Sequence, residues 1–242
     1  MDLYEEQILD YLHILKSQHR TPSDSFFKHT VYGLRYAYRI SGMKEMRVVL
    51  PSIERPKKLP VVLGRNEVRR LLRAPKLLKH RLVLAMLYGC GLRNFELCNL
   101  QLKDLDLERM MLHIRQGKGR KDRYVPLCAM QVRGLRKYIS AERPVTWCFN
   151  GNDSKGGPVA LSARGVQWIV KEARKHSGIQ KEVTTHSLRH SYATHLLEMG
   201  LDIISVKDLL GHADIQTTLT YLHVAQLGRQ RPFSPLERLY DK

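Results

Sequence analysis

A proline-rich stretch divides this sequence into two unequal parts. Residues 48–62 read VVLPSIERPKKLPVV, with three prolines and more basic than acidic side chains. Proline lacks a backbone N–H donor and fixes its own φ angle, so this stretch predicts an extended linker. A chain of 242 residues has room for one domain of ordinary size and a small appendage. We therefore expect a small domain over residues 1–56 and a larger one over residues 57–242.

The pattern of apolar residues predicts a mainly α-helical fold with a small antiparallel β-sheet. Before the linker, apolar residues recur at helical spacing over residues 3–15 and 25–40. After it, MLHIRQ and RYVPL alternate apolar and polar residues on either side of GKGRKD, as the strands of a hairpin do. VTWCFNG is a candidate third strand. Glycines separate the expected C-terminal helices, which lie near 162–177, 186–199, 203–210 and 215–224.

The charge of the sequence favours a polyanionic partner. The formal net charge is +18, and basic side chains that neutralise phosphates release condensed counterions, so nucleic acid is the leading candidate. Charge alone is weak support, because many basic proteins bind no nucleic acid. Basic residues also crowd around the two glycines of the expected hairpin, where a loop would meet phosphate. The residues expected to contact DNA are Arg115, Arg120, Lys121, Arg123, Lys28 and Arg35.

Exported and membrane-spanning proteins are excluded by what the sequence lacks. The N-terminus, MDLYEEQILD, is acidic and has no basic segment followed by an apolar one. No run approaches the ~20 apolar residues that a membrane span needs. The cysteines show no CxxC spacing and are expected to be reduced core residues; they are Cys90, Cys98, Cys128 and Cys148. We expect a cytoplasmic, nucleoid-associated protein without a membrane partner.

Six polar residues occur in an order that suits the cleavage of a phosphodiester. YGCGLRNFEL, GKGRKDRYVPL, THSLRHSYATHLLEMG and LLGHADIQTTLTYLHV contain Arg93, Lys118, His186, Arg189, His212 and Tyr221. Without a metal, such an enzyme must supply cations for the non-bridging oxygens and an acid for the departing oxygen. Arginine suits the first task because its planar fork donates two parallel hydrogen bonds and stays charged. A tyrosine hydroxyl can serve as the nucleophile.

Each of these residues also has an ordinary structural explanation when it is considered alone. The chain has 11 tyrosines, most of which are expected to pack their rings while the hydroxyl reaches water. His186 and His190 lie four residues apart and His195 follows, which is a possible zinc-binding arrangement. Ser187 and Leu188 occupy the intervening positions, where zinc hydrolases carry a glutamate. We therefore expect no metal and no cofactor.

Taken together, the six residues resemble the tyrosine recombinase family, also called phage integrases, which includes the Xer-type recombinases. The resemblance extends from about Leu59 to His223. It implies a catalytic domain over residues 57–242, preceded by a shortened helical core-binding domain over residues 1–56. It also implies an enzyme that cuts and rejoins DNA strands at specific sites through a 3′-phosphotyrosyl intermediate. The implied partners are double-stranded DNA with short inverted repeats and further copies of the chain, as a dimer on each site and a tetramer in synapsis.

The resemblance also implies a task for each member of the set. Tyr221 would attack phosphorus while Arg93 and Arg189 bind the phosphate. His186 would take the proton of the tyrosine, and His212 would donate a further hydrogen bond to the phosphate.

Two further positions carry expectations from the same family. Lys118 resembles the hairpin lysine that protonates the departing 5′ oxygen, and Lys121 is close enough to be the acid instead. Glu96 matches the acidic residue that follows the first arginine, and we expect it to hold the backbone or Arg93 in position.

Two other functions remain open from the sequence. A type IB topoisomerase uses a similar residue set to relax supercoils, and a catalytically impaired or regulatory relative would occupy DNA sites without cutting them. The N-terminal part is shorter than the family's usual core-binding domain, which normally has four or more helices, whereas this chain has room for about two. Near the C-terminus, three residues are candidates for docking on a neighbouring subunit or within the same one: Leu236, Leu239 and Tyr240.

Overall fold

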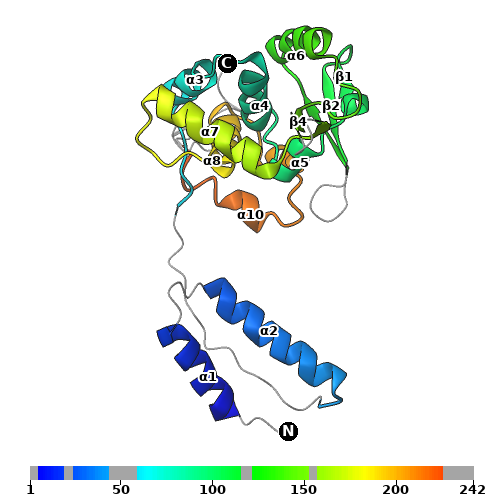
Figure 1. The fold of residues 1–242 in the computed structure, drawn as a ribbon. Coiled ribbons are helices and arrows are strands. Elements are labelled where there is room, and N and C mark those ends of the chain that lie inside the picture. Colours follow the sequence, from blue (N-terminus) through cyan, green and yellow to red (C-terminus); the bar gives the residue numbers. More distant parts are fainter. Residues whose placement is uncertain (1–4, 19–23, 44–58, 116–121, 153–156, 226–242) are drawn as a thin grey trace, which may run out of the picture. The chain divides into compact units, whose positions relative to one another are not determined.

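The computed structural model describes residues 5–18, 24–43, 59–115, 122–152 and 157–225. The chain divides into two compact units, Met1–Lys57 and Lys58–Lys242, so the division lies within the proline-rich stretch. The described elements are mainly helical, with a small antiparallel sheet in the second unit, as the sequence predicted (Figure 1).

The first unit contains two helices, α1 (Glu5–Gln18) and α2 (Asp24–Ile40). They pack through four buried side chains, which are Ile8, Leu12, Val31 and Tyr38. These positions follow the helical spacing of the sequence, and their burial explains why the two segments pair. Arg35, one of the expected DNA contacts, is exposed on α2. The side chain of Lys28 lies outside the described residues.

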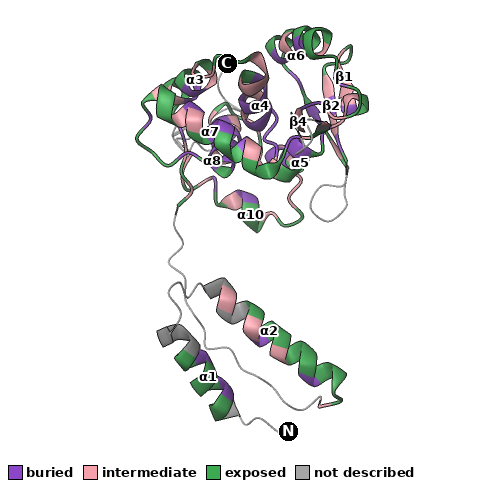
Figure 2. Cartoon of the chain, in the orientation of Figure 1, coloured by how far each residue is buried: buried purple, intermediate pink, exposed green. Residues whose placement is uncertain are grey.

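The second unit is organised around α4 (Leu78–Gly89). Its buried side chains include three consecutive residues, so no side of the helix is wholly polar; they are Leu82, Val83, Leu84, Met86 and Leu87. A helix of this kind belongs in the interior. The helices that pack against it include α3 (Arg65–Arg73), α6 (Ala129–Glu142), α7 (Ala163–Ser177) and α8 (Thr185–Glu198). Figure 2 shows that α7, unlike α4, carries many exposed residues.

The three-stranded sheet has the order β1-β2-β3 and is antiparallel throughout. Its strands are β1 (Leu105–Asp106), β2 (Met111–Ile114) and β3 (Arg123–Pro126), and a 3-10 helix, η1 (Leu102–Asp104), precedes them. The hairpin predicted from MLHIRQ and RYVPL is confirmed, with Leu112 opposite Val125. Leu112 and Val125 are fully buried, which orients this face of the hairpin toward the core.

The predicted third strand was wrong. The strand added to the hairpin is β1, whereas VTWCFNG supplies only an isolated bridge from Trp147 to Gln101 and the start of a second sheet. That sheet pairs β4 (Asn150–Asn152) with β5 (Pro158–Ala160). Cys148 and Phe149 are consecutive residues and both are buried in the core. The segment therefore lacks the alternation of buried and exposed side chains that an edge strand shows.

The C-terminal helices of this unit are separated by glycines in left-handed conformations. Gly178 (φ 68°), Gly200 (φ 91°) and Gly211 (φ 62°) end α7, α8 and α9 (Ile203–Leu210), respectively. The last of the described helices, α10 (Gln216–Leu219), is shorter than the 215–224 expected. It gives way to turns in which Tyr221 N donates to Thr218 O and Leu222 N donates to Leu219 O.

The structure can be compared with two further expectations from the sequence, the absence of a membrane-spanning segment and the core positions of the cysteines. Of the described helices, none is both long and apolar enough to cross a membrane. All four cysteines are free thiols, and Cys90, Cys98 and Cys148 are buried. The expectation of a core position was wrong for Cys128, which is exposed because it is the N-cap of α6.

Candidate active site

The first arginine of the expected set is oriented by the start of a short helix. Arg93 is the N-cap of α5 (Asn94–Cys98) and follows a turn at Gly91 (φ 58°). A Cβ atom at Gly91 would lie 2.4 Å from the ring of Tyr192, so the turn requires glycine. Glu96 accepts hydrogen bonds from the backbone N of Arg93 and from its Nη1, each at 2.8 Å. The helix cap therefore holds both the backbone and the side chain of Arg93, as expected for Glu96.

Glu96 is also the partner of a second arginine, Arg123 of β3. Arg123 Nη1 and Nη2 donate to the two carboxylate oxygens of Glu96 at 2.9 and 2.8 Å. Burial disfavours the charged carboxylate, but hydrogen bonds and charge from Arg123, followed by hydrogen bonds from Arg93, outweigh it and lower the pKa of Glu96 to about 2. The expected DNA contact at Arg123 does not agree with this geometry. Its side chain is only 8% exposed because it is bound to Glu96.

Three arginines meet at the C-terminal end of α9. Consecutive carbonyl oxygens each accept one hydrogen bond: Leu209 from Arg123 Nε (2.9 Å), Leu210 from Arg189 Nη2 (2.6 Å) and Gly211 from Arg93 Nη2 (3.2 Å). The last carbonyls of a helix lack helical partners and carry partial negative charge, so guanidinium groups satisfy them. We call these three carbonyls and their three arginines the arginine turn.

Arg189 is the most deeply placed cation of the arginine turn. Its side chain is 4% exposed, and its Nη1 donates to Gly91 O at 2.5 Å. Burial, followed by repulsion from Arg93, lowers the pKa of Arg189 to about 10. The group therefore remains charged at neutral pH. A charged guanidinium with little water around it interacts strongly with a phosphate anion.

His212 connects the arginine turn to the segment of Tyr221. Its Nε2 lies 3.2 Å from Arg189 Nη2, and its Nδ1 lies 2.9 Å from Thr218 Oγ1. Arginine only donates hydrogen bonds, so Nε2 is the acceptor and a neutral ring carries its hydrogen on Nδ1, directed to Thr218. Thr218 is fully buried. The orientation of His212 is thus determined on both sides of the ring.

Tyr221 lies two residues after the end of α10 and is 3% exposed. Its ring packs in a cluster with Tyr192, Val206 and Leu210. Burial raises the pKa of its hydroxyl, while the positive charges of Arg189 and Arg93 oppose that effect. The ring of Tyr221 also stacks on that of His212, with centroids 6.3 Å apart, and His212 in turn contacts Arg189.

The two histidines of α8 that precede and follow Arg189 are placed differently. His186 is exposed, whereas His190 is partly buried and its Nδ1 lies 3.1 Å from Tyr221 Oη. The two imidazole rings lie 6.3 Å apart between centroids. His195, the third histidine of the zinc alternative, instead contacts the hydroxyl of Tyr88 at 2.8 Å. The three histidines of the zinc alternative therefore do not converge on one metal position.

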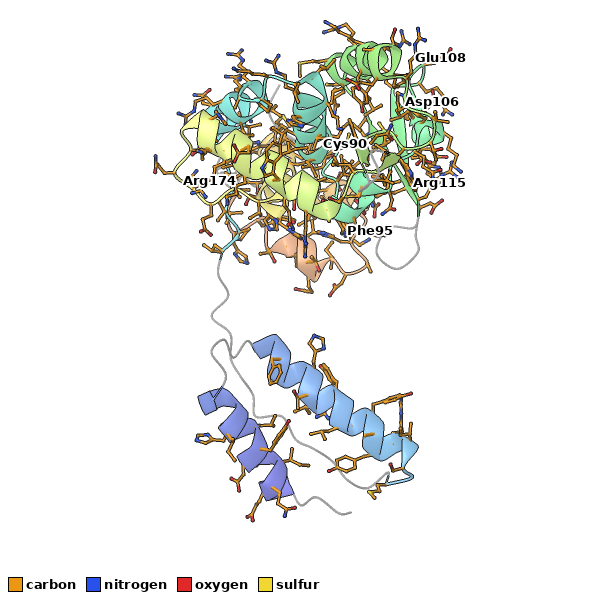
Figure 3. The ribbon with its side chains drawn as sticks, in the orientation of Figure 1. Cys90, Phe95, Asp106, Glu108, Arg115 and Arg174 are labelled. Atoms are coloured by element: carbon orange, nitrogen blue, oxygen red, sulfur yellow. The ribbon has the colours of Figure 1, made fainter. Side chains whose placement is uncertain are left out.

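The hairpin cations are only partly described. Arg115 follows β2, and its Nε pairs with Asp104 Oδ1 at 2.5 Å while the side chain remains 44% exposed. Figure 3 labels Arg115 at the end of the hairpin strand and Phe95 on α5. At the base of the hairpin, the ring of His113 stacks on that of Tyr124 at 4.5 Å. Three expected residues of the connecting segment lie outside the described residues, namely Lys118, Arg120 and Lys121.

The fold thus brings together residues that are far apart in the sequence. Among the expected site residues, Arg93, Arg189, His212 and Tyr221 gather around the end of α9, and Glu96 supports them. Sequence reasoning did not assign three supporting residues to this site: Arg123, His190 and Thr218. A signal existed for His190, which shares the helix of Arg189 and lies four residues after His186.

Comparison with known sequences identifies the phage integrase family. The sequence model of the phage integrase family matches residues 62–227. The tyrosine recombinase XerA of Thermococcus kodakarensis is 39% identical over 196 residues, which cover 80% of this chain and 69% of that protein.

Comparison with solved structures gives similar folds. A crystal structure of XerA recombinase has a TM-score of 0.66 at 28% sequence identity, covering 95% of this chain and 84% of that one. The site-specific recombinase XerH, solved with its difH substrate in a pre-cleavage complex, has a TM-score of 0.72 at 23% identity. The match covers 91% of this chain and 67% of that one, and at this identity it concerns the fold alone.

Proposed function

This chain belongs to the phage integrase family and is a tyrosine recombinase, and we propose that it cuts and rejoins DNA through a 3′-phosphotyrosyl intermediate formed on Tyr221. The observation that carries this proposal is the position of Tyr221, whose ring stacks on that of His212 with centroids 6.3 Å apart, while His212 Nε2 lies 3.2 Å from Arg189 Nη2. A scissile phosphate held by the guanidinium groups of Arg93 and Arg189 would lie next to a potential nucleophile. Its developing negative charge would be stabilised by donors that are already in place.

The chemistry follows from this arrangement. Attack by Tyr221 Oη on phosphorus forms a phosphotyrosyl ester and releases the 5′ oxygen of the DNA. The ester conserves the bond energy, so resealing requires no external source of energy. When Arg189 turns to the phosphate, His212 is proposed to donate a hydrogen bond to it from Nε2, with the ring hydrogen moved to Nε2 and the Thr218 hydroxyl donating to Nδ1. A proton acceptor for Tyr221 would come from α8, which carries both His186 and His190.

The departing 5′ oxygen needs a proton donor. We assign this to a lysine of the hairpin connection, Lys118 or Lys121, because a flexible lysine among like charges can reach the leaving group and release a proton. Arg115 and Arg120 would contact the DNA backbone nearby. Lys28 and Arg35 of the first unit would do the same elsewhere on the duplex.

The partner is proposed to be double-stranded DNA that carries short inverted repeats. A net charge of +18 favours such a partner. XerH has been solved with a DNA substrate, which supports DNA as the partner of this chain as well. We propose a dimer on each site and a tetramer when two sites exchange strands, and a nucleoid-associated, cytoplasmic location follows from that substrate.

The domain assignment is a proposal of the same kind. Residues 57–242 would form the catalytic domain, and the two helices within residues 1–56 would form a shortened core-binding domain. In this arrangement the first unit would add backbone contacts, while the second carries the chemistry.

The experiment that tests this function begins by finding the site. The full chain would be used to select bound duplexes from a random-sequence pool, and the recovered site would be placed in a nicked suicide duplex. A covalent protein–DNA adduct would then be detected on a denaturing gel. We expect an adduct with the wild-type protein and none with Tyr221→Phe. Tyr192→Phe is the matched control, because Tyr192 packs in the same cluster and should retain adduct formation.

Three results would reject the proposal or redirect it. An adduct that persists in Tyr221→Phe would rule out this nucleophile. Binding without any adduct would indicate a regulatory DNA-binding relative. On a plasmid that carries two copies of the site, relaxed circles without recombinant product would indicate a topoisomerase instead.

A further inference from the structure

The hydroxyl of the proposed nucleophile contacts a histidine for which the sequence suggested only a metal-binding alternative. His190 Nδ1 lies 3.1 Å from Tyr221 Oη, and the two ring centroids are 5.5 Å apart. Among the described residues, no hydrogen bond joins this hydroxyl to His186, which is exposed on the same helix. Of the two histidines that flank Arg189, His190 is therefore the one in contact with the reacting oxygen.

The surroundings of His190 keep its ring neutral. Burial, followed by the charges of His186 and Arg189, lowers its pKa to about 4. A neutral imidazole has one nitrogen that carries hydrogen and one that accepts it. A neutral phenol has a hydrogen to donate. An Nδ1 acceptor facing the Tyr221 hydroxyl therefore satisfies both groups when the hydrogen of the ring is on Nε2.

We propose that His190 is a catalytic residue whose Nδ1 holds the Tyr221 hydroxyl and takes its proton as Oη attacks phosphorus. The proposal rests on the function proposed above. In this step the Oη–P bond forms, the P–O5′ bond breaks with its electron pair on O5′, and O5′ receives a proton from the hairpin lysine. During resealing, Nδ1 returns the proton to Oη.

A weakly basic imidazole is sufficient for this task. The hydroxyl becomes far more acidic as its oxygen bonds to phosphorus, so the proton moves late in the step to an acceptor already within hydrogen-bond distance. The phosphate anion also offsets the positive charge of Arg189, which favours the protonated form of His190 at that moment. The same weak basicity makes the imidazolium a good donor when the strand is rejoined.

The same helix offers an internal control for this assignment. His195 contacts Tyr88 Oη through Nδ1 at 2.8 Å, with ring centroids 5.8 Å apart. This pair has the same chemical groups as His190–Tyr221, and Tyr88 belongs to α4 and has no place in the proposed chemistry. Changing His195 therefore measures the structural consequence of losing a histidine–tyrosine contact on α8.

The first experiment measures single-turnover adduct formation on the suicide duplex with His190→Asn, His190→Phe, His186→Asn and His195→Asn. Asparagine can accept a hydrogen bond close to the position of Nδ1, but it cannot take a proton. We expect both His190 variants to form adduct about 100-fold more slowly, at unchanged DNA affinity, since general base catalysis typically contributes this much or more. His195→Asn should stay within about threefold of the wild type.

Chemical rescue provides the second arm of that experiment. Imidazole in the buffer should restore at least about a tenth of the wild-type rate to His190→Ala, because this variant lacks only the proton acceptor. Tyr221→Phe should stay inactive, because it lacks the nucleophile. A wild-type rate in His190→Asn would overturn proton transfer to His190. Loss of activity in His186→Asn alone, with rescue by imidazole only for a His186→Ala protein, would transfer the assignment to His186.

A second measurement needs no DNA. Long-range 15N–1H NMR spectra of the wild-type protein report which nitrogen of His190 carries hydrogen, and Tyr221→Phe identifies the signal that depends on the hydroxyl. We expect an unprotonated Nδ1 whose shift changes in Tyr221→Phe. Hydrogen on Nδ1 at neutral pH would overturn the proposal. An absent wild-type adduct with an unprotonated Nδ1 would instead reject the function proposed above while retaining the contact.

Discussion

The two halves of the proposed active site are held in place by different forces. In the arginine turn, charged hydrogen bonds join three guanidinium groups to the end of α9, and Glu96 binds two of them. Tyr221, in contrast, follows a helix of only four residues, and its ring is packed among apolar neighbours. The cation site is fixed by electrostatics, and the nucleophile is fixed mainly by packing.

Because of this difference, substitutions in the arginine turn and at Tyr221 should have different effects on stability and catalysis. Donors that are fixed before the substrate arrives cost no reorganisation during the reaction, so the arginine turn supports catalysis through its rigidity. Its buried charges also depend on one another for stability. Changes in the arginine turn should therefore affect both folding and chemistry, whereas removal of the Tyr221 hydroxyl, which loses one hydrogen bond to His190, should affect chemistry far more than folding.

The largest effect is expected for Arg189→Ala. Removal of a preorganised donor should reduce transition-state stabilisation by about 3 to 4 kcal/mol, which is roughly a 10²- to 10³-fold slower cleavage. Single-turnover adduct formation would measure this loss. Denaturant unfolding should also show a much larger loss of stability in Arg189→Ala than in Tyr221→Phe, which loses only the hydrogen bond to His190. Equal stability of the two variants would contradict the distinction between the two halves.

Glu96→Gln should be the most destabilising conservative change. The substitution keeps the size of the side chain but removes the negative charge between Arg93 and Arg123, and we expect a loss of about 3 kcal/mol in the free energy of unfolding. Glu67→Gln is the matched control, because Glu67 pairs with Lys181 near the surface at 2.7 Å. That variant should lose less than about 1 kcal/mol. Similar losses in both variants would show that burial of the Glu96 charge does not matter.

Low pH should reduce the free energy of unfolding because Glu96 becomes protonated. The pKa of Glu96 is lowered to about 2 in the folded protein, against about 4.3 in an unfolded chain. The unfolded state therefore binds the proton first, and the contribution of Glu96 is complete above pH ~4.3 and is lost as the pH falls toward 2. Unfolding of the wild type and Glu96→Gln should differ by a constant amount at neutral pH and converge in this acidic window. A difference that persists undiminished below it would be inconsistent with this assignment.

The smallest effect is expected at the glycine of the arginine turn. Gly211 and Gly178 have similar φ angles, 62° and 68°, and alanine at either position should cost about 1 kcal/mol of stability. A Cβ atom at Gly211 would lie 3.0 Å from Arg123 Nη1, whereas none of the described atoms lies within 4 Å of one at Gly178. Gly211→Ala should therefore be less stable than Gly178→Ala and cleave more slowly. If Gly211→Ala and Gly178→Ala have the same stability and the same cleavage rate, the side chain of Arg123 can shift without affecting either.

Much of the local structure could be predicted because its signals are local. The helices expected near 162–177 and 203–210 agree with α7 and α9, and glycine with a positive φ angle ends each of them. The strands of the hairpin followed from alternation around a glycine-containing segment. The helix α6 was not predicted, and the proposed third strand was wrong because burial of Cys148 and Phe149 is decided by neighbours distant in sequence.

The site could be predicted only in part. Arg93, Glu96, Arg189, His212 and Tyr221 follow from motif order and resemblance, but the order contains no distances. Arg123 was expected to contact DNA, since a loop rich in basic residues predicts exposure. In the fold its guanidinium is bound to Glu96 and to Leu209 O, because a buried carboxylate needs more than one charged donor.

By itself, the sequence determined which groups are present in the site: two arginines for phosphate, a tyrosine hydroxyl, two motif histidines and a basic hairpin. It also determined the glycines and helix caps that shape the segment around each group. Only the tertiary structure decided which of these groups meet. The end of α9 selects three arginines from three different elements, and the turns after α10 bring Tyr221 to His190 instead of His186. The physical reason is that a helix end or a buried charge must be satisfied by whichever donors the fold brings within hydrogen-bond distance, and that choice is not recorded in any local pattern.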